Sequence, residues 1–337
     1  MPASGQKIVI AVLKHTLTSH MANIGIMLNL IWDCVFKVKR PRVTSVDIRM
    51  IKPDELKYEH PKKPFMTTAT SEVYKGEYNG FAVAIKRYMD PMNTSPGEVR
   101  SVFKKEVDTM KRFESPYILR MFGICIQDES SPEPEFLIIM EYCEKGSLRQ
   151  LLAKSDCKLS WTRKARMCLD AAQGLYRLHQ TEEKSNVHGY INSCKFLVAE
   201  GYRVKLGGFE LSKTETSLKK QTKDEEIRSL CYSSPQMLNS INNVYSKKCE
   251  MYSFGIVLWE IATRRIPFEG HSDKDIYQKV CKERYQEPLP DDCPEPLRQL
   301  IEDCRAYDSF QRPSAGVLVD KLRSVVAQME EKKATQL

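Results

Sequence analysis

The sequence lacks the marks of a secreted disulfide scaffold or a repeat protein. Its eleven cysteines are an odd number, and none stand in a Cys-x-x-Cys pair. They are scattered through apolar stretches such as Ile124-Cys125-Ile126, and no internal repeat or low-complexity tract is present. This cysteine usage favours a reducing compartment over an extracellular disulfide framework. We therefore expect a cytoplasmic protein.

An excess of basic over acidic residues is nearly absent outside the first fifth of the chain. The formal net charge of the 337 residues is +8 at pH 7. Residues 1–63 hold eleven Lys and Arg against five Asp and Glu, which places +6 of that charge in this segment. The remainder is close to neutral, which argues against a nucleic-acid-binding domain and a nucleic-acid partner.

A long uninterrupted apolar run is also missing from the first 47 residues. The stretch from Met21 to Phe36 contains Asn23, Asn29 and Asp33, and it leads into basic residues 37–42. A transmembrane helix needs about 20 apolar residues. Two interpretations stay open: an interfacial helix or signal-anchor, and a poorly ordered leader or an inaccurate gene prediction. We treat residues 1–47 as an atypical basic and apolar leader whose authenticity is open.

Proline residues then divide the chain, and the pattern after them changes from strand to helix. Prolines between residues 41 and 64 predict a linker over 48–64, before a domain of residues 65–331 and a tail of 332–337. Alternating residues 71–78 and 81–86 flank Asn79-Gly80, which is a strong hairpin signal. Apolar spacing predicts a helix over 98–113, strands over 118–126 and 136–140, and later helices over 147–154, 161–179, 249–264, 273–282, 295–305 and 315–330. We expect an α+β fold with a small β-rich lobe in front of a larger helical lobe.

Several short segments resemble protein kinases, in the order in which kinases carry them. Val83-Ala-Ile-Lys86 resembles the nucleotide-binding lysine strand, and Glu106 takes the place of its carboxylate partner. Residues 137–143 resemble the hinge, residues 187–195 the catalytic loop and residues 204–210 the metal loop. Ser234-Pro-Gln236, the segment from Glu250 to Gly255, and Arg312-Pro313 follow in kinase order. The resemblance implies a two-lobed protein-kinase-like fold.

In detail, the chain resembles the family of mixed lineage kinase domain-like proteins, which are effectors of necroptosis. The resemblance rests on residues 175–179, 204–211 and 252–263, and it runs from near Ile48 almost to the last residue. That family also carries an N-terminal four-helix bundle that perturbs membranes, and residues 1–47 do not resemble it. Whether such a bundle is truly absent stays open, and so does membrane association.

Three positions that serve phosphoryl transfer in kinases carry the wrong chemistry here. Tyr190 stands in the place of the catalytic aspartate, and a phenol with a pKa near 10 is a poor base at neutral pH. Lys195 and Gly208 replace the two metal ligands, and neither side chain offers an oxygen. Met66, Thr68 and Ser71 replace the glycines of the phosphate loop. We expect no catalytic residue, no metal and no kinase activity.

Other residues of the resemblance are retained and imply a nucleotide site. Lys86 and Glu106 form a potential ion pair, and a lysine that projects from a strand is costly to bury without a partner. Met140 stands at the gatekeeper position, and His188, Phe209 and Met110 match the apolar column that joins the lobes. The expected contacts of ATP, bound without magnesium, are Val73, Ala84, Lys86, Glu106, Met140, Glu141, Cys143 and Leu197.

The resemblance also implies a switch. Thr216 and Ser217 match phosphoacceptors of the family, in a segment from Lys213 to Ser229 that lacks apolar periodicity. A further hypothesis places Glu215 in competition with Glu106 for Lys86, with phosphorylation deciding between them. The implied partners are an upstream receptor-interacting serine/threonine kinase and, in oligomers, further copies or full-length relatives.

We expect an inactive pseudokinase that acts as a phosphorylation-controlled switch in necroptosis. Two alternatives stay open. One is a residual ATPase or atypical protein kinase that uses Lys86. The other is a regulatory binding partner of the upstream kinase that has no membrane-effector activity.

Overall fold

The computed structural model describes residues 48–68, 71–89, 96–128, 134–180, 186–209, 213–214, 230–240 and 242–335. The chain divides into Met1–Ile48 and Arg49–Leu337, and the fold described below belongs to the second unit. The leader expected over residues 1–47 lies outside the described residues.

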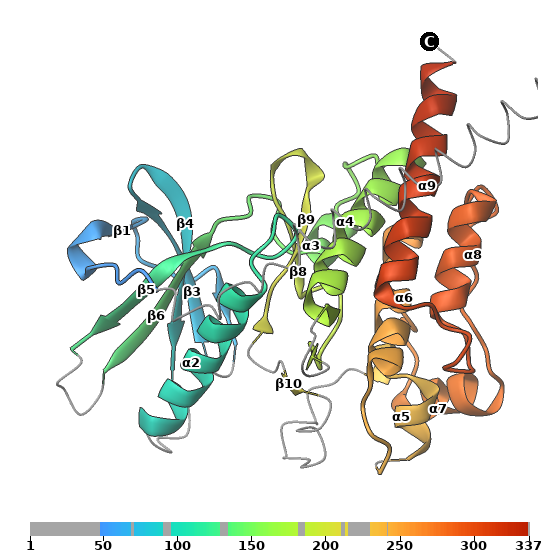
Figure 1. Ribbon diagram of the computed structural model, residues 1–337, viewed down its shortest axis with the longest axis horizontal. Helices are drawn as coiled ribbons and strands as arrows, with labels where there is room; N and C mark the ends of the chain where they lie inside the picture. The colour runs from blue at the N-terminus through green and yellow to red at the C-terminus, as the bar shows by residue number, and fades with distance from the viewer. Residues whose placement is uncertain are drawn as a thin grey trace, which may run out of the picture. The chain divides into compact units, whose positions relative to one another are not determined.

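The small lobe is built on an antiparallel sheet in the order β1-β3-β4-β6-β5, with β2 paired to β3 (Figure 1). The predicted hairpin is confirmed, because Asn79 and Gly80 join β3 to β4 with φ angles of 49° and 80°. Both residue types tolerate this left-handed backbone, which a two-residue turn requires. The strands are β1 (Leu56–Tyr58), β2 (Met66–Thr67), β3 (Ser71–Tyr78), β4 (Phe81–Tyr88), β5 (Met121–Gln127) and β6 (Glu135–Glu141).

The two faces of this sheet have different neighbours. Tyr74, Val83, Ile85 and Ile139 share one face, and they pack into a core cluster with Ile51 and Leu56. Helix α2 (Pro96–Arg112) contacts β6 and carries Glu106 to the other face, where Lys86 lies. The alternation of the strands therefore separates an apolar core from a face with a charged pair.

Residues 48–64 differ from the linker that the prolines predicted. After the short helical turn η1 (Pro53–Glu55), β1 pairs with β3. Ile51 and Leu56 are 2% and 7% exposed. The prolines do break the helical pattern, but the apolar residues beside them find a place in the sheet. This segment is part of the small lobe.

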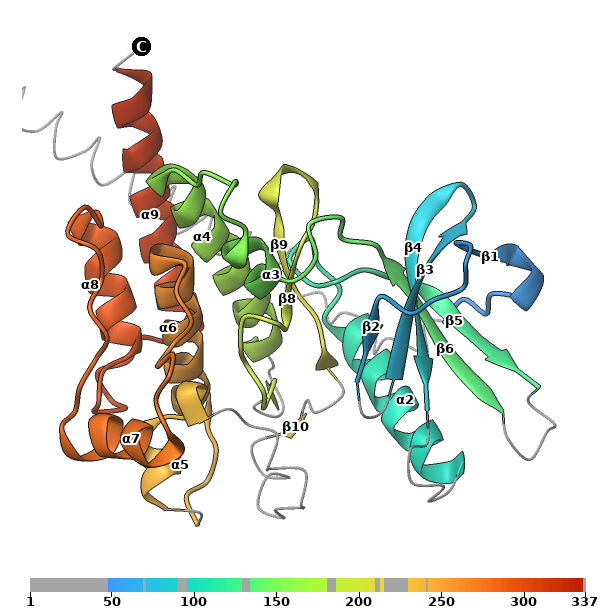
Figure 2. The same ribbon diagram turned by 180° about the vertical axis from the view of Figure 1, so that it is seen from behind.

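The larger lobe is mainly helical, as expected (Figure 2). Its helices are α3 (Leu148–Ala153), α4 (Trp161–His179), α5 (Pro235–Asn239), α6 (Lys247–Thr263), α7 (Asp273–Tyr277), α8 (Glu295–Cys304) and α9 (Ala315–Ala334). Helix α6 is buried along almost its whole length, from Cys249 to Ala262, and α4 packs against α9. The helix predicted over 273–282 is split, because the π-helical turn η7 (Gln278–Lys282) follows α7.

Short strands lie between the sheet and the helices. They are β7 (Asn186–Val187), β8 (Phe196–Val198), β9 (Val204–Leu206) and β10 (Lys213–Thr214), with the helical turns η2 (Glu200–Tyr202) and η6 (Leu230–Tyr232). β8 pairs with β9, and β10 pairs with β7. Leu206 also bridges to Ile118, which links this hairpin to the segment before β5. In the parts of the chain that the structure describes, no helix has the length and apolarity to cross a membrane.

Candidate nucleotide-binding site

Lys86 on β4 and Glu106 on α2 form a buried ion pair. The Lys86 Nζ lies 2.7 Å from the Glu106 Oε2, and the two side chains are 8% and 2% exposed. Tyr88 donates a hydrogen bond to the same carboxylate oxygen, and its ring centroid lies 5.0 Å from the Lys86 Nζ. The expected pair is therefore present. Sequence reasoning missed Tyr88, although its place two residues after Lys86 on one strand put it on the same face.

The expected apolar contacts of the adenine share the face that carries Lys86. Directly opposed residues of antiparallel strands lie on the same face, and the register pairs Val73 with Lys86 and Ala84 with Met140. All of these side chains are less than 10% exposed. Leu197 lies on β8 and is half-buried. The strands thus gather an apolar surface beside one ammonium group, a combination that fits a base and its phosphates.

The positions of the missing phosphate-loop glycines lie in and beside β2. Met66 pairs with Val73, while Thr68 and Ser71 bond to each other. The Ser71 N–H donates to the Thr68 Oγ1 over 3.0 Å, and the two hydroxyl oxygens are 2.9 Å apart. Side chains therefore close this turn, with polar groups where glycine would leave the backbone exposed.

The hinge residues Glu141 and Cys143 have structural partners of their own. Both carboxylate oxygens of Glu141 lie 2.8 Å from the Lys205 Nζ on β9, and Glu141 also accepts a bond from the Arg120 N–H. Cys143 is buried, which raises the pKa of its thiol to about 12. The Glu141 side chain thus joins β6 to β9, a role that the sequence did not reveal.

Tyr190, Lys195 and Gly208 come together, although Gly208 lies on a different segment. The Lys195 Nζ lies 5.2 Å from the centroid of the Tyr190 ring. Gly208 has a φ of +72°, and a Cβ added to it would lie 2.6 Å from the Lys195 Cδ. The three positions therefore form one group, and its positively charged member is Lys195.

Glu250 on α6 anchors the loop that carries Tyr190 and Lys195. This carboxylate accepts bonds from the N–H groups of His188 (2.9 Å) and Gly189 (2.8 Å), and it lies 3.0 Å from the His179 Nε2. The Tyr245 hydroxyl donates to it as well. Burial favours a higher pKa for Glu250, but the bond from His179 and the nearby positive charges outweigh burial and hold the pKa below its usual value.

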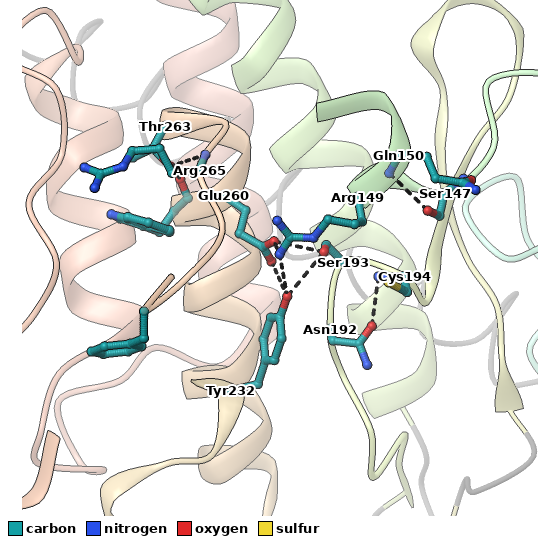
Figure 3. A network of polar contacts seen from close by, with 12 residues as sticks. Ser147, Arg149, Gln150, Asn192, Ser193, Cys194, Tyr232, Glu260, Thr263 and Arg265 are labelled. Carbon is teal, nitrogen blue, oxygen red and sulfur yellow. Dashed lines mark hydrogen bonds and ion pairs between the residues drawn. The ribbon is translucent and has the colours of Figure 1, made fainter. Parts of the chain in front are cut away.

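A second buried carboxylate, Glu260 on α6, anchors the same loop further along (Figure 3). It accepts hydrogen bonds from the Ser193 hydroxyl over 2.9 Å and from the Tyr232 hydroxyl over 2.8 Å, and it pairs with Arg149 on α3. Burial raises the pKa of Tyr232, so this hydroxyl remains a donor at neutral pH. The network joins the loop to η6, which precedes α5.

Two further sets of motif residues lie away from Lys86. The expected apolar column is buried: His188 and Phe209 are fully buried, with ring centroids 5.4 Å apart, and Met110 is 3% exposed. Arg312 donates to the Gln236 Oε1 over 2.7 Å, so this arginine has a neutral side-chain acceptor.

The residues of the expected switch, which are Glu215, Thr216 and Ser217, lie outside the described residues. Their roles, and the nucleotide contacts named above, stay predictions.

The geometry above agrees with comparisons to known proteins. The family model described as "Protein tyrosine and serine/threonine kinase" matches residues 63–322. The chain belongs to this kinase family.

Among curated relatives, this kinase-family chain is 48% identical over 266 residues to the "Mixed lineage kinase domain-like protein" of Mus musculus, and 49% identical over 255 residues to that of Homo sapiens. These matches cover 77% and 75% of the chain, but 55% and 54% of the relatives. The "Probable serine/threonine-protein kinase drkC" of Dictyostelium discoideum is 33% identical over 256 residues, which is 76% of the chain and 33% of that protein. The chain thus spans about half the length of its mammalian relatives and matches their kinase-like region.

Proposed function

We propose that this chain is a catalytically inactive pseudokinase that binds ATP without magnesium and serves as a phosphorylation-controlled switch in necroptotic signalling. The observation that carries the proposal is the group of Tyr190, Lys195 and Gly208, together with the retained Lys86–Glu106 pair. The pair and the apolar face support a nucleotide. The neutral phenol of Tyr190 is a poor base, and neither Lys195 nor Gly208 has a side-chain oxygen that could bind a metal.

Nucleotide binding is tested by thermal unfolding of the purified protein with ATP and EDTA. ATP should raise the midpoint temperature, because a ligand that binds only the native state stabilises it by RT ln(1 + [L]/Kd). Lys86→Met should abolish the shift, whereas Lys57→Met, which removes an exposed lysine paired with Glu77, should retain it. No shift with the wild-type protein would contradict nucleotide binding.

The alternative of a residual ATPase or atypical protein kinase is tested by turnover. Release of phosphate from ATP with magnesium, above the level of the Lys86→Met variant, would overturn the inactive pseudokinase. We expect both proteins to release the same background amount.

The switch rests on the resemblance to mixed lineage kinase domain-like proteins, and its residues are Thr216 and Ser217. We propose that a receptor-interacting serine/threonine kinase phosphorylates them in the cytoplasm, with self-association and recruitment to a membrane as outcomes. Mass spectrometry after incubation with such a kinase should find phosphate at these residues. Labelling confined to other residues would contradict this assignment.

A regulatory partner without effector activity and an effector should have different effects on cell survival. Expression of this chain in cells that lack their own mixed lineage kinase domain-like protein separates the two. Cell death after the necroptotic stimulus favours an effector, and binding of the upstream kinase without death favours the regulator.

A further inference from the structure

The side chain of Lys195 lies directly against Gly208. The hairpin of β8 and β9 fixes the two residues, since Phe196 pairs with Leu206 and the Gly207 N–H donates to the Lys195 carbonyl over 2.9 Å. A Cβ at position 208 would lie 2.6 Å from the Lys195 Cδ and 3.2 Å from its Nζ. A larger residue at position 208 would therefore force Lys195 to move.

A divalent cation does not fit these residues. In the kinase family these two positions carry the oxygen ligands of magnesium. Here neither side chain has an oxygen, and the ammonium group lies close to the place where a side chain at position 208 would begin. A lysine repels a metal ion.

Lys195 lies two positions before a residue of the proposed nucleotide site. It stands in a bend directly before β8, and Leu197 is the central residue of that strand. Phe196 and Val198 are buried, whereas Lys195 and Leu197 are both half-buried. Leu197 is an expected contact of ATP. The start of the hairpin therefore carries a partly exposed cation close in the chain to an apolar side chain of the proposed site.

The contact with Tyr190 suits a cation that must keep its charge. An aromatic face attracts an ammonium group through its quadrupole. The substitutions at positions 190, 195 and 208 are thus mutually consistent: one contacts the ammonium, one supplies it and one leaves room for it.

We propose that Lys195 takes the place of the metal ion and binds the phosphates of the nucleotide, and that Gly208 is required for this because it leaves space for the lysine. This inference rests on the proposed nucleotide binding. The Lys86–Glu106 pair supplies a single ammonium group, and the triphosphate of ATP carries several negative charges, so without magnesium the phosphates need a further cation. Lys195 is the charged group that this geometry places beside the metal position.

The first experiment measures affinities for ATP and for adenosine by calorimetry in EDTA. Lys195→Met should weaken ATP binding at least tenfold and leave adenosine binding unchanged. The matched control is Lys279→Met, because Lys279 is also half-buried and lies 4.7 Å from a tyrosine ring, that of Tyr285, in the helical lobe. This control should bind both ligands as the wild type does. Lys195→Gln replaces Lys195→Met if the latter fails to fold.

The second experiment restores the metal ligands. Magnesium should not raise the affinity of the wild-type protein for ATP, whereas the double variant K195N/G208D should bind ATP at least fivefold more tightly with magnesium than with EDTA. Gly208→Asp alone should lower the midpoint temperature, because its side chain meets Lys195.

The outcomes separate the two proposals. A wild-type protein that binds neither ATP nor adenosine overturns nucleotide binding and this inference together. A wild-type protein that binds ATP in EDTA, with an unchanged ratio of ATP to adenosine affinity in Lys195→Met, overturns the role of Lys195 alone. Tighter binding by the wild-type protein with magnesium does the same.

Discussion

The loop of residues 188–195 has two sides with opposite electrostatics. On the side that faces α6, the buried carboxylates of Glu250 and Glu260 accept hydrogen bonds from the backbone of the loop and from Ser193. Towards Gly208, the loop itself carries no Asp or Glu, and Lys195 provides a positive charge. A kinase needs carboxylates for both purposes, to hold the loop and to perform the chemistry. In this chain the carboxylates that hold the loop are present, whereas the loop itself contributes no carboxylate.

Among the substitutions that test this comparison, the removal of Glu250, the first anchor of the loop, should have the largest effect on stability. Glu250→Ala leaves the N–H groups of His188 and Gly189 buried without their acceptor and His179 without its carboxylate. Breaking a buried pair in this way costs about 3–5 kcal/mol. Denaturant unfolding should report a loss of this size. A loss below about 1 kcal/mol would mean that the loop does not depend on Glu250.

The same anchor should give stability a dependence on pH. Because the folded state holds the pKa of Glu250 below its usual 4.5, the unfolded state binds the proton first as the pH falls. The contribution of this carboxylate is therefore complete above about pH 4.5 and is lost below it. The difference in unfolding free energy between the wild type and Glu250→Gln should narrow as the pH drops below 4.5. A constant difference would contradict the assignment.

Removal of a single donor from the second anchor should have a smaller effect, because the carboxylate and its other donors remain. Tyr232→Phe removes one hydrogen bond to Glu260 and leaves Ser193 and Arg149 in place. A hydrogen bond to a charged group contributes about 1.5–3 kcal/mol, and the lower end applies where other donors remain. Denaturant unfolding measures the loss. Tyr277→Phe is a control within the helical lobe and should change stability little.

The smallest effect should come from adding a carboxylate. Gln236→Glu gives the buried Arg312 a charged acceptor in place of a neutral one, and charge-assisted bonds are roughly twice as strong. Burial lowers the pKa of Arg312, so a carboxylate would also favour its charged form. We expect a gain of about 1 kcal/mol in unfolding free energy. A loss would show that desolvating the new carboxylate outweighs the pair.

The sequence predicted those parts of the fold that local patterns determine. Asn79-Gly80 specified its hairpin, and the helical spacing of residues 161–179 matched α4. The split of the predicted helix over 273–282 followed no local signal that we recognised. The sequence did not reveal that the carboxylate of Glu141, an expected nucleotide contact, joins β9 through Lys205, a residue 64 positions away. Such pairings depend on tertiary packing and leave no spacing in the sequence.

The residues of the candidate site also divide into those that the sequence identified and those that it did not. Lys86, Glu106 and the three altered positions were found because they stand in motifs. Tyr88, Tyr232 and Glu260 were missed because a tyrosine on a strand or a glutamate on a buried helix has no motif that distinguishes it. Their roles come from where β4, η6 and α6 place them. The close contact of Lys195 with Gly208 is likewise a property of the β8–β9 hairpin.

The segment of residues 49–58, which precedes the kinase family match, limits where a shortened form of this protein can begin. The Ile51 N–H donates to the Ile124 carbonyl over 2.8 Å, and the Arg49 carbonyl lies 2.4 Å from where a Cβ on Gly123 would stand. Only glycine lets the two backbones approach so closely. A shortened chain that begins at residue 63, where the kinase family match starts, would lose Ile51 and Leu56 and expose the apolar face that they cover. A shortened protein for expression and crystallisation should therefore begin before Arg49. The boundary of the kinase family match differs from the boundary that packing sets.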